Sequence, residues 1–409
     1  MTAEPRSRPA SGEDFPVHLF LVIATLVAAA AVAFDDWRLL FAGGHHWPLE
    51  RDFVIFRVAS EAIWRGDLIT VFDPSRFSAL LSDYFGPQVF TPFPYPPLAV
   101  WFVAPLAALP SVLAWPTWLV ITFAGFAAAL RRCFAGSWQW VLMLVAAPAS
   151  LVNIASGQNG FLSAALLAGG LLLLERRPIV AGVLIGLLTF KPQLGILLPA
   201  VFLAGGYYRA FAGAAATTLL LFAGSVALLG WMPWSLYLDI GLQMQWRLLD
   251  EGVGAFTFMV PTFFMAARLL GLPLWLSYAA HGIVAVAVLA TCCWAIRRPA
   301  PLQRRIALVM TGALLAPPYV FNYDMTILLA AQVIAWPGYR NMNGFDRAVF
   351  AMAWLVPAFV MEAGIARLPI APLILLSQFL VLLRWVKSEA AGPQKTAMAA
   401  PGSGQGETA

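Results

Sequence analysis

The sequence predicts an all-α polytopic membrane protein, and three observations support this fold class. Of its 409 residues, 61% are hydrophobic and only 11% are charged, whereas ordinary soluble domains carry about 25% charged residues. The chain contains roughly a dozen apolar windows, several of them shorter than the ~20 residues that a membrane-spanning helix needs. Pairs of arginines flank these windows, as they do in cytoplasmic loops. We expect about 12 crossings in one helical domain, with both termini in the cytoplasm.

Composition also excludes several classes of function. The net charge of +5 and the isoelectric point near 9.3 would suit a nucleic-acid-binding protein, but the arginines mark loops beside apolar segments, so we expect no nucleic-acid partner. The three cysteines, Cys133, Cys292 and Cys293, have the spacing of neither a metal site nor a disulfide framework. We expect no cofactor and assign no metal-ligating residue, while a metal requirement stays open.

The charge pattern orders the N-terminal elements. Residues 1–16 form a polar cytoplasmic segment, and the first span, Val17–Phe34, is interpreted as uncleaved. Residues 35–94 then form the first extracytoplasmic loop. Within it, residues 52–65 predict a helix that lies in the membrane interface, because polar and apolar side chains fall on different sides. Residues 95–130 are too long for one span and are interrupted by Pro105, Pro110 and Pro116, so we expect one crossing preceded by a broken or half-inserted segment.

The same charge rule orders the remaining spans. The expected crossing segments are residues 141–153, 161–174, 179–190 with 194–203, 210–230, 274–296, 306–316, 326–336, 348–361 and 368–386. Residues 231–272 form a second outer loop, whose apolar piece at 256–270 is expected to be partly inserted. The membrane domain therefore covers residues 17–386. The tail, residues 387–409, is rich in Ala, Gly, Pro and Ser and is expected to be disordered in the cytoplasm.

This topology places the unusual polar motifs on one side of the membrane. They are the loop around Asp52, Phe93–Pro97, Ser156–Asn159, Lys191–Gln193 and Pro317–Asp324. All are expected at the outer face, whereas the cytoplasmic loops carry little besides arginine. We therefore predict a single site at the extracytoplasmic surface of the membrane.

Asp52 is the first candidate for a catalytic base, since it opens a helix at the edge of the bilayer. The alternative is an ordinary helix N-cap, where an aspartate accepts a backbone N–H. Asp35 and Asp36, directly after the first span, are rival candidates for the base. The alternative interpretation of these two aspartates is that they only mark the solvated boundary at the end of a membrane helix.

Lys191 is one of three lysines and the only one inside the apolar region. A lone charge there costs about 2.5 to 3.5 kcal/mol on insertion scales, so Lys191 is expected near the surface or beside an anion. A lipid phosphate is the natural partner. The alternative is a lysine that snorkels to water from the tip of a helical hairpin.

Several other polar residues have both a structural and a substrate-binding interpretation. Tyr95 precedes Pro96–Pro97, which can simply begin a helix. Gln158 and Asn159 follow a glycine, so they can form a tight turn or bind the hydroxyls of a sugar. Asn322 and Asp324 precede a span from its outer end, where Asp324 can cap the helix or bind substrate.

These parts suit the transfer of a sugar from a lipid phosphate. An acceptor hydroxyl needs one carboxylate as general base, and the leaving phosphate needs positive charge in place of a general acid. Glycoside hydrolysis, in contrast, usually uses two carboxylates. One aspartate, one lysine and loop arginines such as Arg57 are sufficient.

The order of the motifs resembles glycosyltransferase family 87, a family of GT-C membrane transferases. The resemblance rests on Asp52-Phe53-x-x-Phe56-x-x-Ala59, Tyr95-Pro96-Pro97-Leu98, Gly157-Gln158-Asn159 and Gly182-x-x-x-Gly186-x-x-x-x-Lys191-Pro192. It runs from about residue 50 to residue 330. It implies a GT-C-type bundle, a polyprenyl-phosphate sugar such as polyprenyl-phosphate mannose as donor, an inverting reaction and Asp52 as the base.

We therefore expect a hexosyltransferase of the plasma (inner) membrane that uses a lipid or glycan acceptor on the extracytoplasmic face. Membrane lipids are its other expected partners. The alternative from another class is a transporter or lipid flippase, which would show repeats and ionisable groups near the middle of the bilayer. A structural assembly subunit would leave Lys191 unexplained.

Overall fold

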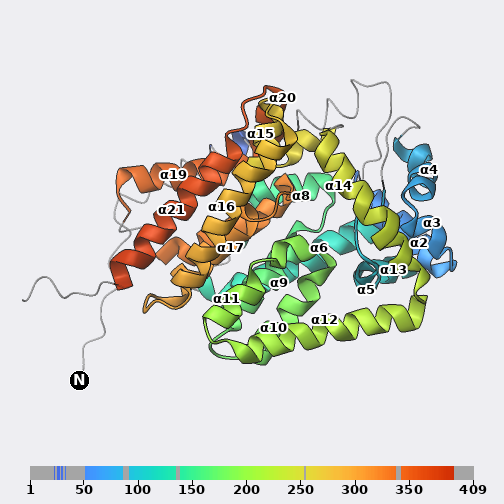
Figure 1. Ribbon diagram of the computed structural model, residues 1–409, viewed down its shortest axis with the longest axis horizontal. Helices are drawn as coiled ribbons and strands as arrows, with labels where there is room; N and C mark the ends of the chain where they lie inside the picture. The colour runs from blue at the N-terminus through green and yellow to red at the C-terminus, as the bar shows by residue number, and fades with distance from the viewer. Residues whose placement is uncertain are drawn as a thin grey trace, which may run out of the picture.

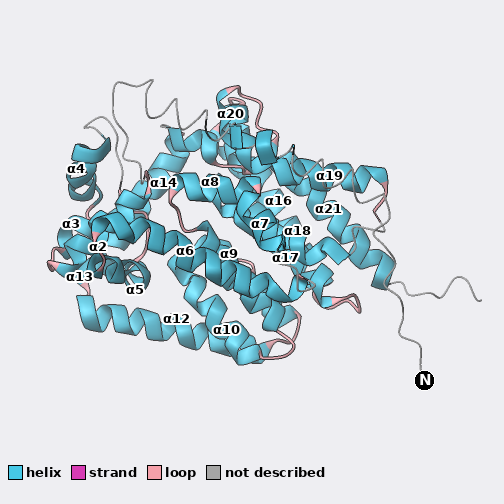
Figure 2. Ribbon diagram, turned by 180° about the vertical axis from the view of Figure 1, so that it is seen from behind, coloured by secondary structure: helices cyan, strands magenta, loops and turns pink. Residues whose placement is uncertain are grey.

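The computed structural model describes residues 51–85, 92–134, 139–252, 255–337 and 342–390, together with scattered helical positions between residues 23 and 33. Within these residues every regular element is a helix, as Figure 2 shows from behind. The first span, Val17–Phe34, is described only at the scattered positions. The rival bases Asp35 and Asp36 lie outside the described residues.

Short helices make up the described part of the predicted first outer loop and the broken segment after it. They are α2 (Phe53–Trp64), α3 (Leu68–Phe72), α4 (Pro74–Phe85), η1 (Pro97–Ala99), α5 (Val100–Val103) and η2 (Ala104–Ala108). The full-length helix α6 (Ser111–Leu130) follows after Pro110. The predicted broken segment ahead of one crossing-length helix is therefore confirmed at the level of helix lengths.

The middle of the chain contains the helices that surround the centre of the bundle. They are α7 (Gln139–Ala146), α8 (Pro148–Ser156), α9 (Gly160–Leu173), α10 (Pro178–Leu187), η4 (Leu188–Phe190), η5 (Pro192–Gly195), α11 (Leu198–Ala204) and α12 (Tyr208–Leu229). Residues 231–272, the predicted second outer loop, form α13 (Met232–Leu236), a π-helical turn (Tyr237–Gly241), α14 (Leu242–Glu251), η7 (Ala255–Met259) and α15 (Phe263–Leu269).

The C-terminal part completes the bundle. Its helices are α16 (Leu274–Ala295), α17 (Leu302–Leu315), η8 (Asn322–Met325), α18 (Thr326–Ala335), α19 (Gly344–Leu355), η10 (Val356–Phe359), α20 (Val360–Ile365) and α21 (Ala371–Ala390). Helix α21 continues through Lys387 to Ala390, so the predicted start of the tail at residue 387 is wrong by four residues. The cause is the good helix-forming character of Lys, Glu and Ala at this end.

Helix α9 lies at the centre, where it packs against α6, α10, α17 and α18 (Figure 1). All ten residues of α18 and the last ten residues of α17 are buried. A helix of 14 residues is only about 21 Å long at 1.5 Å per residue, shorter than the ~30 Å hydrocarbon core. These central helices therefore pack inside the protein, where neighbouring helices cover them.

Five helices in the described residues are long and apolar enough to cross a membrane. They are Ser111–Cys133, Tyr208–Leu229, Leu274–Ala295, Gly344–Ile365 and Ala371–Ala390. A sixth is possible if α7 and α8, which are bent by 61° at their junction, count as one broken span. Pro148 begins α8 and causes this break, because proline lacks the N–H that would continue the helix. The expected number of about 12 crossings stays a prediction.

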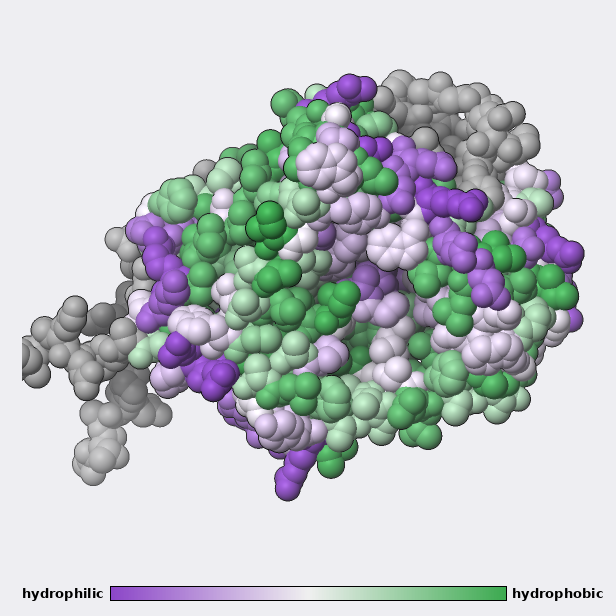
Figure 3. Space-filling view, in the orientation of Figure 1, coloured by the Kyte–Doolittle hydropathy of each residue, from purple (hydrophilic) through white to green (hydrophobic). Residues whose placement is uncertain are grey.

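The long helices present apolar surface outward. In Figure 3, green surface covers the regions of α16 and α12, and purple surface gathers toward the two ends of the molecule. An 18-residue stretch of helix α12 has a mean hydropathy of 1.9, and only 6% of that stretch is buried, as expected for a lipid-facing helix. Several apolar helices of this kind identify a membrane protein.

Helix α12 is held to α10 by a pair of glycines. A Cβ atom on Gly182 would lie 2.2 Å from the backbone oxygen of Ala210, and one on Gly186 would lie 2.5 Å from the Cβ of Thr217. Only glycine allows the two backbones to approach this closely, as in small-xxx-small pairs of membrane helices. The Gly182-x-x-x-Gly186 motif therefore serves helix packing.

The arginine pairs gather away from the first outer loop. Arg305 donates to Glu175 at 2.8 Å and to the backbone of Ile296 at 2.9 Å, and Arg304 pairs with Glu389 at 2.7 Å. These contacts join the end of α9, the α16–α17 loop and the end of α21, which lie opposite α2–α4 in Figure 1. The segregation agrees with the charge pattern from which the topology was predicted.

The two predicted membrane-surface segments are packed into the protein more deeply than expected. Helix α2 is buried on most sides, and even its polar residue Ser60 is fully buried, with its hydroxyl donating to Arg57 O. In the second loop, Phe264 and Met265 of α15 are buried against α16 and the segment before η8. Amphipathic patterning showed which residues are apolar, but not that other helices cover the remaining sides.

Candidate functional site

Six of the residues predicted to form the site are joined in one chain of hydrogen bonds. The members come from five separate segments and are Asp52, Gln158, Tyr95, Asn159, Lys191 and Asp324, in the order of their contacts. We call this set the polar chain. Five members are buried, and Asp52 alone is only half-buried. The structure therefore brings these six residues together, and their roles in catalysis and substrate binding stay predictions.

Asp52 occupies the N-cap position of α2 but does not cap it. Its side chain accepts no hydrogen bond from the helix backbone, and its Oδ2 accepts instead from Gln158 Nε2 at 3.2 Å. The described loop aspartates Asp67 and Asp73 both accept backbone N–H groups, from Thr70 and Ser75. The alternative interpretation of Asp52 as an ordinary N-cap is therefore wrong, and its carboxylate is available for another role.

The environment of Asp52 makes its carboxylate more basic than usual. Burial raises the pKa of this group, because a low-dielectric surrounding disfavours the charged form. The hydrogen bond from Gln158 and the charge of Arg51 oppose the rise in pKa. Because burial has the largest effect, the net result is a carboxylate with a higher proton affinity than an exposed aspartate.

Lys191 is buried at the break between η4 and η5, with 2% exposure. Its Nζ donates to Asp324 Oδ1 at 2.5 Å and to Asn159 Oδ1 at 2.9 Å, and lies 4.5 Å from the centre of the Tyr323 ring. The snorkelling alternative is therefore wrong. The anionic partner in the structure is Asp324 of the same chain, because two buried opposite charges compensate each other.

Asp324 also has the capping role considered from the sequence. Its Oδ2 accepts from the backbone N–H of Phe321 at 3.1 Å, which ties the start of η8 together. One oxygen of this carboxylate therefore binds the local backbone, and the other binds Lys191. This double use explains why Asp324 tolerates complete burial.

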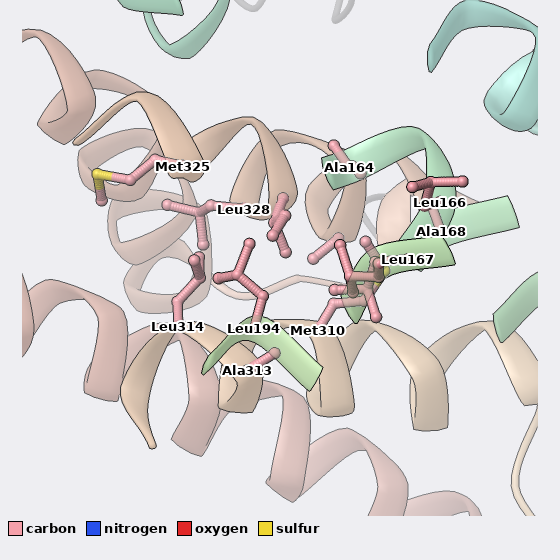
Figure 4. Close-up of a cluster of buried hydrophobic side chains, with 14 of the residues drawn as sticks. Ala164, Leu166, Leu167, Ala168, Leu194, Met310, Ala313, Leu314, Met325 and Leu328 are labelled. Atoms are coloured by element: carbon pink, nitrogen blue, oxygen red, sulfur yellow. The ribbon is translucent and has the colours of Figure 1, made fainter. Parts of the chain in front are cut away.

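Apolar side chains pack beside the Lys191 end of the polar chain, toward the centre of the bundle. Leu194 of η5 and Met325 of η8 follow Lys191 and Asp324 closely in sequence and point into a buried apolar cluster with Leu314 and Leu328 (Figure 4). No water is expected in such a closely packed apolar cluster. The polar chain is therefore bounded by apolar packing at its Lys191 end, and it approaches the surface at its Asp52 end.

Tyr95 is held in the middle of the polar chain by aromatic rings. The rings of Phe93, Phe56 and Phe190 have their centres 5.4, 5.5 and 6.4 Å from that of Tyr95. Pro96 is extended and Pro97 begins η1, so the predicted role of this motif in starting a helix is confirmed. The hydroxyl of Tyr95 accepts from Asn159 at 2.8 Å and donates to Gln158 at 3.3 Å.

Two predicted site residues have other contacts. Arg57 donates to Glu61 at 3.4 Å and lies 5.4 Å over the Tyr84 ring, and its side chain is 14% exposed. Asn322 is buried, and its Oδ1 accepts from the backbone N–H of Tyr323 at 2.9 Å. These particular contacts do not include a member of the polar chain, so substrate contact by either residue stays a prediction.

The sequence did not reveal several residues that hold the polar chain in place. Trp118 of α6 donates to the backbone oxygen of Gln158 at 3.3 Å, and the Tyr323 ring covers Lys191. Asn153 of α8 accepts from the backbone N–H of Gly160 at 2.8 Å. The sequence could have indicated Asn153, because it is a polar amide within an apolar run. Nothing in the local sequence distinguishes Trp118 from other tryptophans of membrane helices.

Gly160 allows the start of α9 to touch η8 directly. A Cβ atom at this position would lie 2.2 Å from the backbone oxygen of Tyr323 and 2.6 Å from Asn153 Oδ1. We expect Gly160→Ala to lower the free energy of unfolding by about 1 to 3 kcal/mol, since the backbones must separate. The apparent melting temperature of the purified protein measures this effect.

Gly282→Ala in the middle of α16 is the matched control for that substitution. Nothing lies within 4 Å of a Cβ added at Gly282, and alanine is the better helix former, so no loss of stability is expected. Equal melting temperatures for the two variants would contradict the close approach of α9 to η8.

Within the described residues, no group of three or more His, Cys, Asp and Glu side chains is arranged as a metal site requires. The chemistry available in the polar chain is that of one accessible carboxylate, with hydrogen-bond donors arranged behind it.

Comparison with known proteins identifies the family. A sequence model of glycosyltransferase family 87 matches residues 93–318, more than half of the chain. The matched range includes Tyr95, Gln158, Asn159 and Lys191, whereas Asp324 lies six residues beyond its end and Asp52 lies 41 residues before its start. No curated protein and no solved structure matches the chain. These findings support a glycosyltransferase with a sugar donor and an acceptor, and they do not support a transporter or flippase. The chain belongs to glycosyltransferase family 87.

Proposed function

We propose that this protein transfers a hexose, with mannose as the first choice, from a polyprenyl-phosphate donor to a lipid or glycan acceptor. The reaction takes place at the extracytoplasmic face of the plasma (inner) membrane and inverts the anomeric centre. One observation carries the proposal: Asp52 is the half-buried end of an otherwise buried polar chain, and it has no capping hydrogen bond. A carboxylate so placed is oriented by the protein and accessible to a substrate.

In the proposed reaction Asp52 accepts the proton of the acceptor hydroxyl. The hydroxyl oxygen attacks the anomeric carbon, the bond from that carbon to the phosphate oxygen breaks, and polyprenyl phosphate leaves with the bonding electrons. The leaving group is a stable anion, so positive charge replaces a general acid.

The donor phosphate needs a cationic partner. Arg57 is the better placed candidate, since its guanidinium is partly exposed on the helix that Asp52 begins. Lys191, the residue favoured by the sequence, is already paired with Asp324 and Asn159. A direct contact of Lys191 with phosphate would require this buried pair to open.

The test is transfer of radiolabelled sugar by the purified protein in lipid nanodiscs. Polyprenyl-phosphate mannose, polyprenyl-phosphate glucose and a nucleotide-sugar donor are offered separately with membrane lipids as acceptors. Labelled product from a polyprenyl-phosphate donor supports the proposal. Product from the nucleotide sugar alone would overturn the assigned donor class.

The pH dependence of transfer provides an independent check on Asp52. A general base works only when it is deprotonated, so kcat/KM falls as the pH drops through the pKa of the base. Since burial raises the pKa of Asp52, we expect the acid limb at a higher pH than the ~3.9 of an ordinary aspartate. An acid limb at or below that value would contradict the assignment of this carboxylate.

A further inference from the structure

The hydrogen bonds of the polar chain have a direction that the chemistry of Lys191 determines. An ammonium group can only donate, so Asn159 must present its oxygen to Lys191 and its Nδ2 to Tyr95. The Tyr95 oxygen accepts from Asn159, and its hydrogen is then directed to Gln158 Oε1. Gln158 is left with its Nε2 facing Asp52.

The opposite direction would be incompatible with an ionised base. If Gln158 were turned around, its Oε1 would face the oxygens of Asp52, and two acceptors would meet unless the carboxyl were protonated. The observed direction presents a donor to Asp52 and so favours the carboxylate. The direction depends on Tyr95, whose hydroxyl both accepts from Asn159 and donates to Gln158. It is the sole hydroxyl among the six members of the polar chain, so without it the direction is no longer passed from Asn159 to Gln158.

We propose that Tyr95 is a positioning residue for the base, which keeps the Gln158 amide directed at Asp52, and that Lys191 sets this direction from the buried end. The inference rests on the proposed function, in which Asp52 is the base. It assigns Tyr95 and Lys191 an effect on the reaction without contact to the sugar or the phosphate.

The geometry around Tyr95 supports such a role. Its side chain is 4% exposed, and three phenylalanine rings fix the plane of its ring. Its hydroxyl already makes one accepted and one donated hydrogen bond. A direct hydrogen bond to a substrate hydroxyl would require one of these bonds to break.

Other charged groups near Asp52 define what the experiment must hold constant. Arg51 is adjacent in sequence, and Tyr95 and Tyr323 also interact electrostatically with this carboxyl. Of the helices packed against α2, α4 carries Arg76, Asp83 and Tyr84, whereas α3, α5, η2 and α6 carry no titratable side chain. All of these groups except Tyr95 remain in the variant below.

The experiment compares the pH profile of kcat/KM for wild type and Tyr95→Phe. Loss of the hydroxyl frees the Gln158 amide, so the hydrogen bond that favours the carboxylate weakens and the acid limb moves up by about half a pH unit. The KM for the donor stays unchanged. Tyr278→Phe is the matched control. It removes a tyrosine hydroxyl that donates to Asp250 at 2.5 Å and that is not part of the polar chain, so the acid limb should stay in place.

A second variant tests the role of Lys191 separately. Lys191→Met combined with Asp324→Leu removes both charges together, leaves Asn159 free to turn, and should raise the acid limb in the same direction. It also keeps the inference testable if Tyr95→Phe does not fold. If the acid limb of the folded variant lay at the same pH as that of wild type, the inference would be overturned. A raised KM for the donor without any change in the acid limb would also overturn it. Absence of transfer by wild type would instead refute the proposed function itself.

Discussion

Asp52→Asn is expected to lower the rate of sugar transfer by about 10²- to 10⁴-fold, the usual contribution of a general base. Asparagine has the size of aspartate and can still accept the hydrogen bond from Gln158 Nε2 through its oxygen. It cannot take a proton from an acceptor hydroxyl. The variant should therefore insert and fold normally, and the loss should appear in the radiolabel transfer assay alone.

Asp67→Asn is the matched control in the same outer loop. Asp67 is exposed and caps α3 through the backbone N–H of Thr70, a role that asparagine performs equally well. Its transfer rate should equal that of wild type. Normal turnover by Asp52→Asn would remove the assignment of the base, and Asp35→Asn and Asp36→Asn would then be the next variants to assay.

The second large effect concerns the buried pair of Lys191 and Asp324. Lys191→Met leaves the carboxylate of Asp324 buried without its cation, and Asp324→Leu leaves the ammonium without its anion. Each single change is expected to lower the free energy of unfolding by about 3 to 5 kcal/mol. The double variant should recover most of this loss, because both charges are then absent from the apolar interior.

Thermal unfolding of the four proteins in one detergent measures this pattern. Arg65→Met is the control, since the pair of Arg65 with Glu61 has side chains 73% and 36% exposed and such a surface pair contributes about 0 to 1 kcal/mol. If the double variant melted below both single variants, the two charges would not compensate each other in the way that the structure indicates.

Much of the local architecture followed from the sequence. Pro105 and Pro110 predicted a broken segment ahead of one long helix, and the structure has η2 and the start of α6 there, whereas Pro116 lies inside α6 without breaking it. Charge asymmetry separated the arginine-rich loops from the polar motifs. Both signals are local, because a proline acts on its own helix and an arginine marks the loop in which it lies.

The sequence also selected the polar residues to examine and predicted a single site for them, although it did not predict their partners. A lysine within an apolar run needs an anion, and the sequence offered a lipid phosphate for that role. The structure supplies Asp324, which lies 133 residues away along the chain. No periodicity or spacing encodes such a pair, since it depends on how α9, η5 and η8 pack together.

The same distinction applies to Asp52 and the helix that it precedes. Composition and the polar pattern identified a carboxylate at the start of a helix, with capping as an equal interpretation of its position. The tertiary structure decided between them, because Gln158, 106 residues away, provides the donor and the backbone of α2 does not. The sequence by itself determined the helical membrane class, the segregation of charge and the set of polar residues. The packing of helices decided burial, partners and the direction of each hydrogen bond, because these depend on contacts between segments that are distant in the chain.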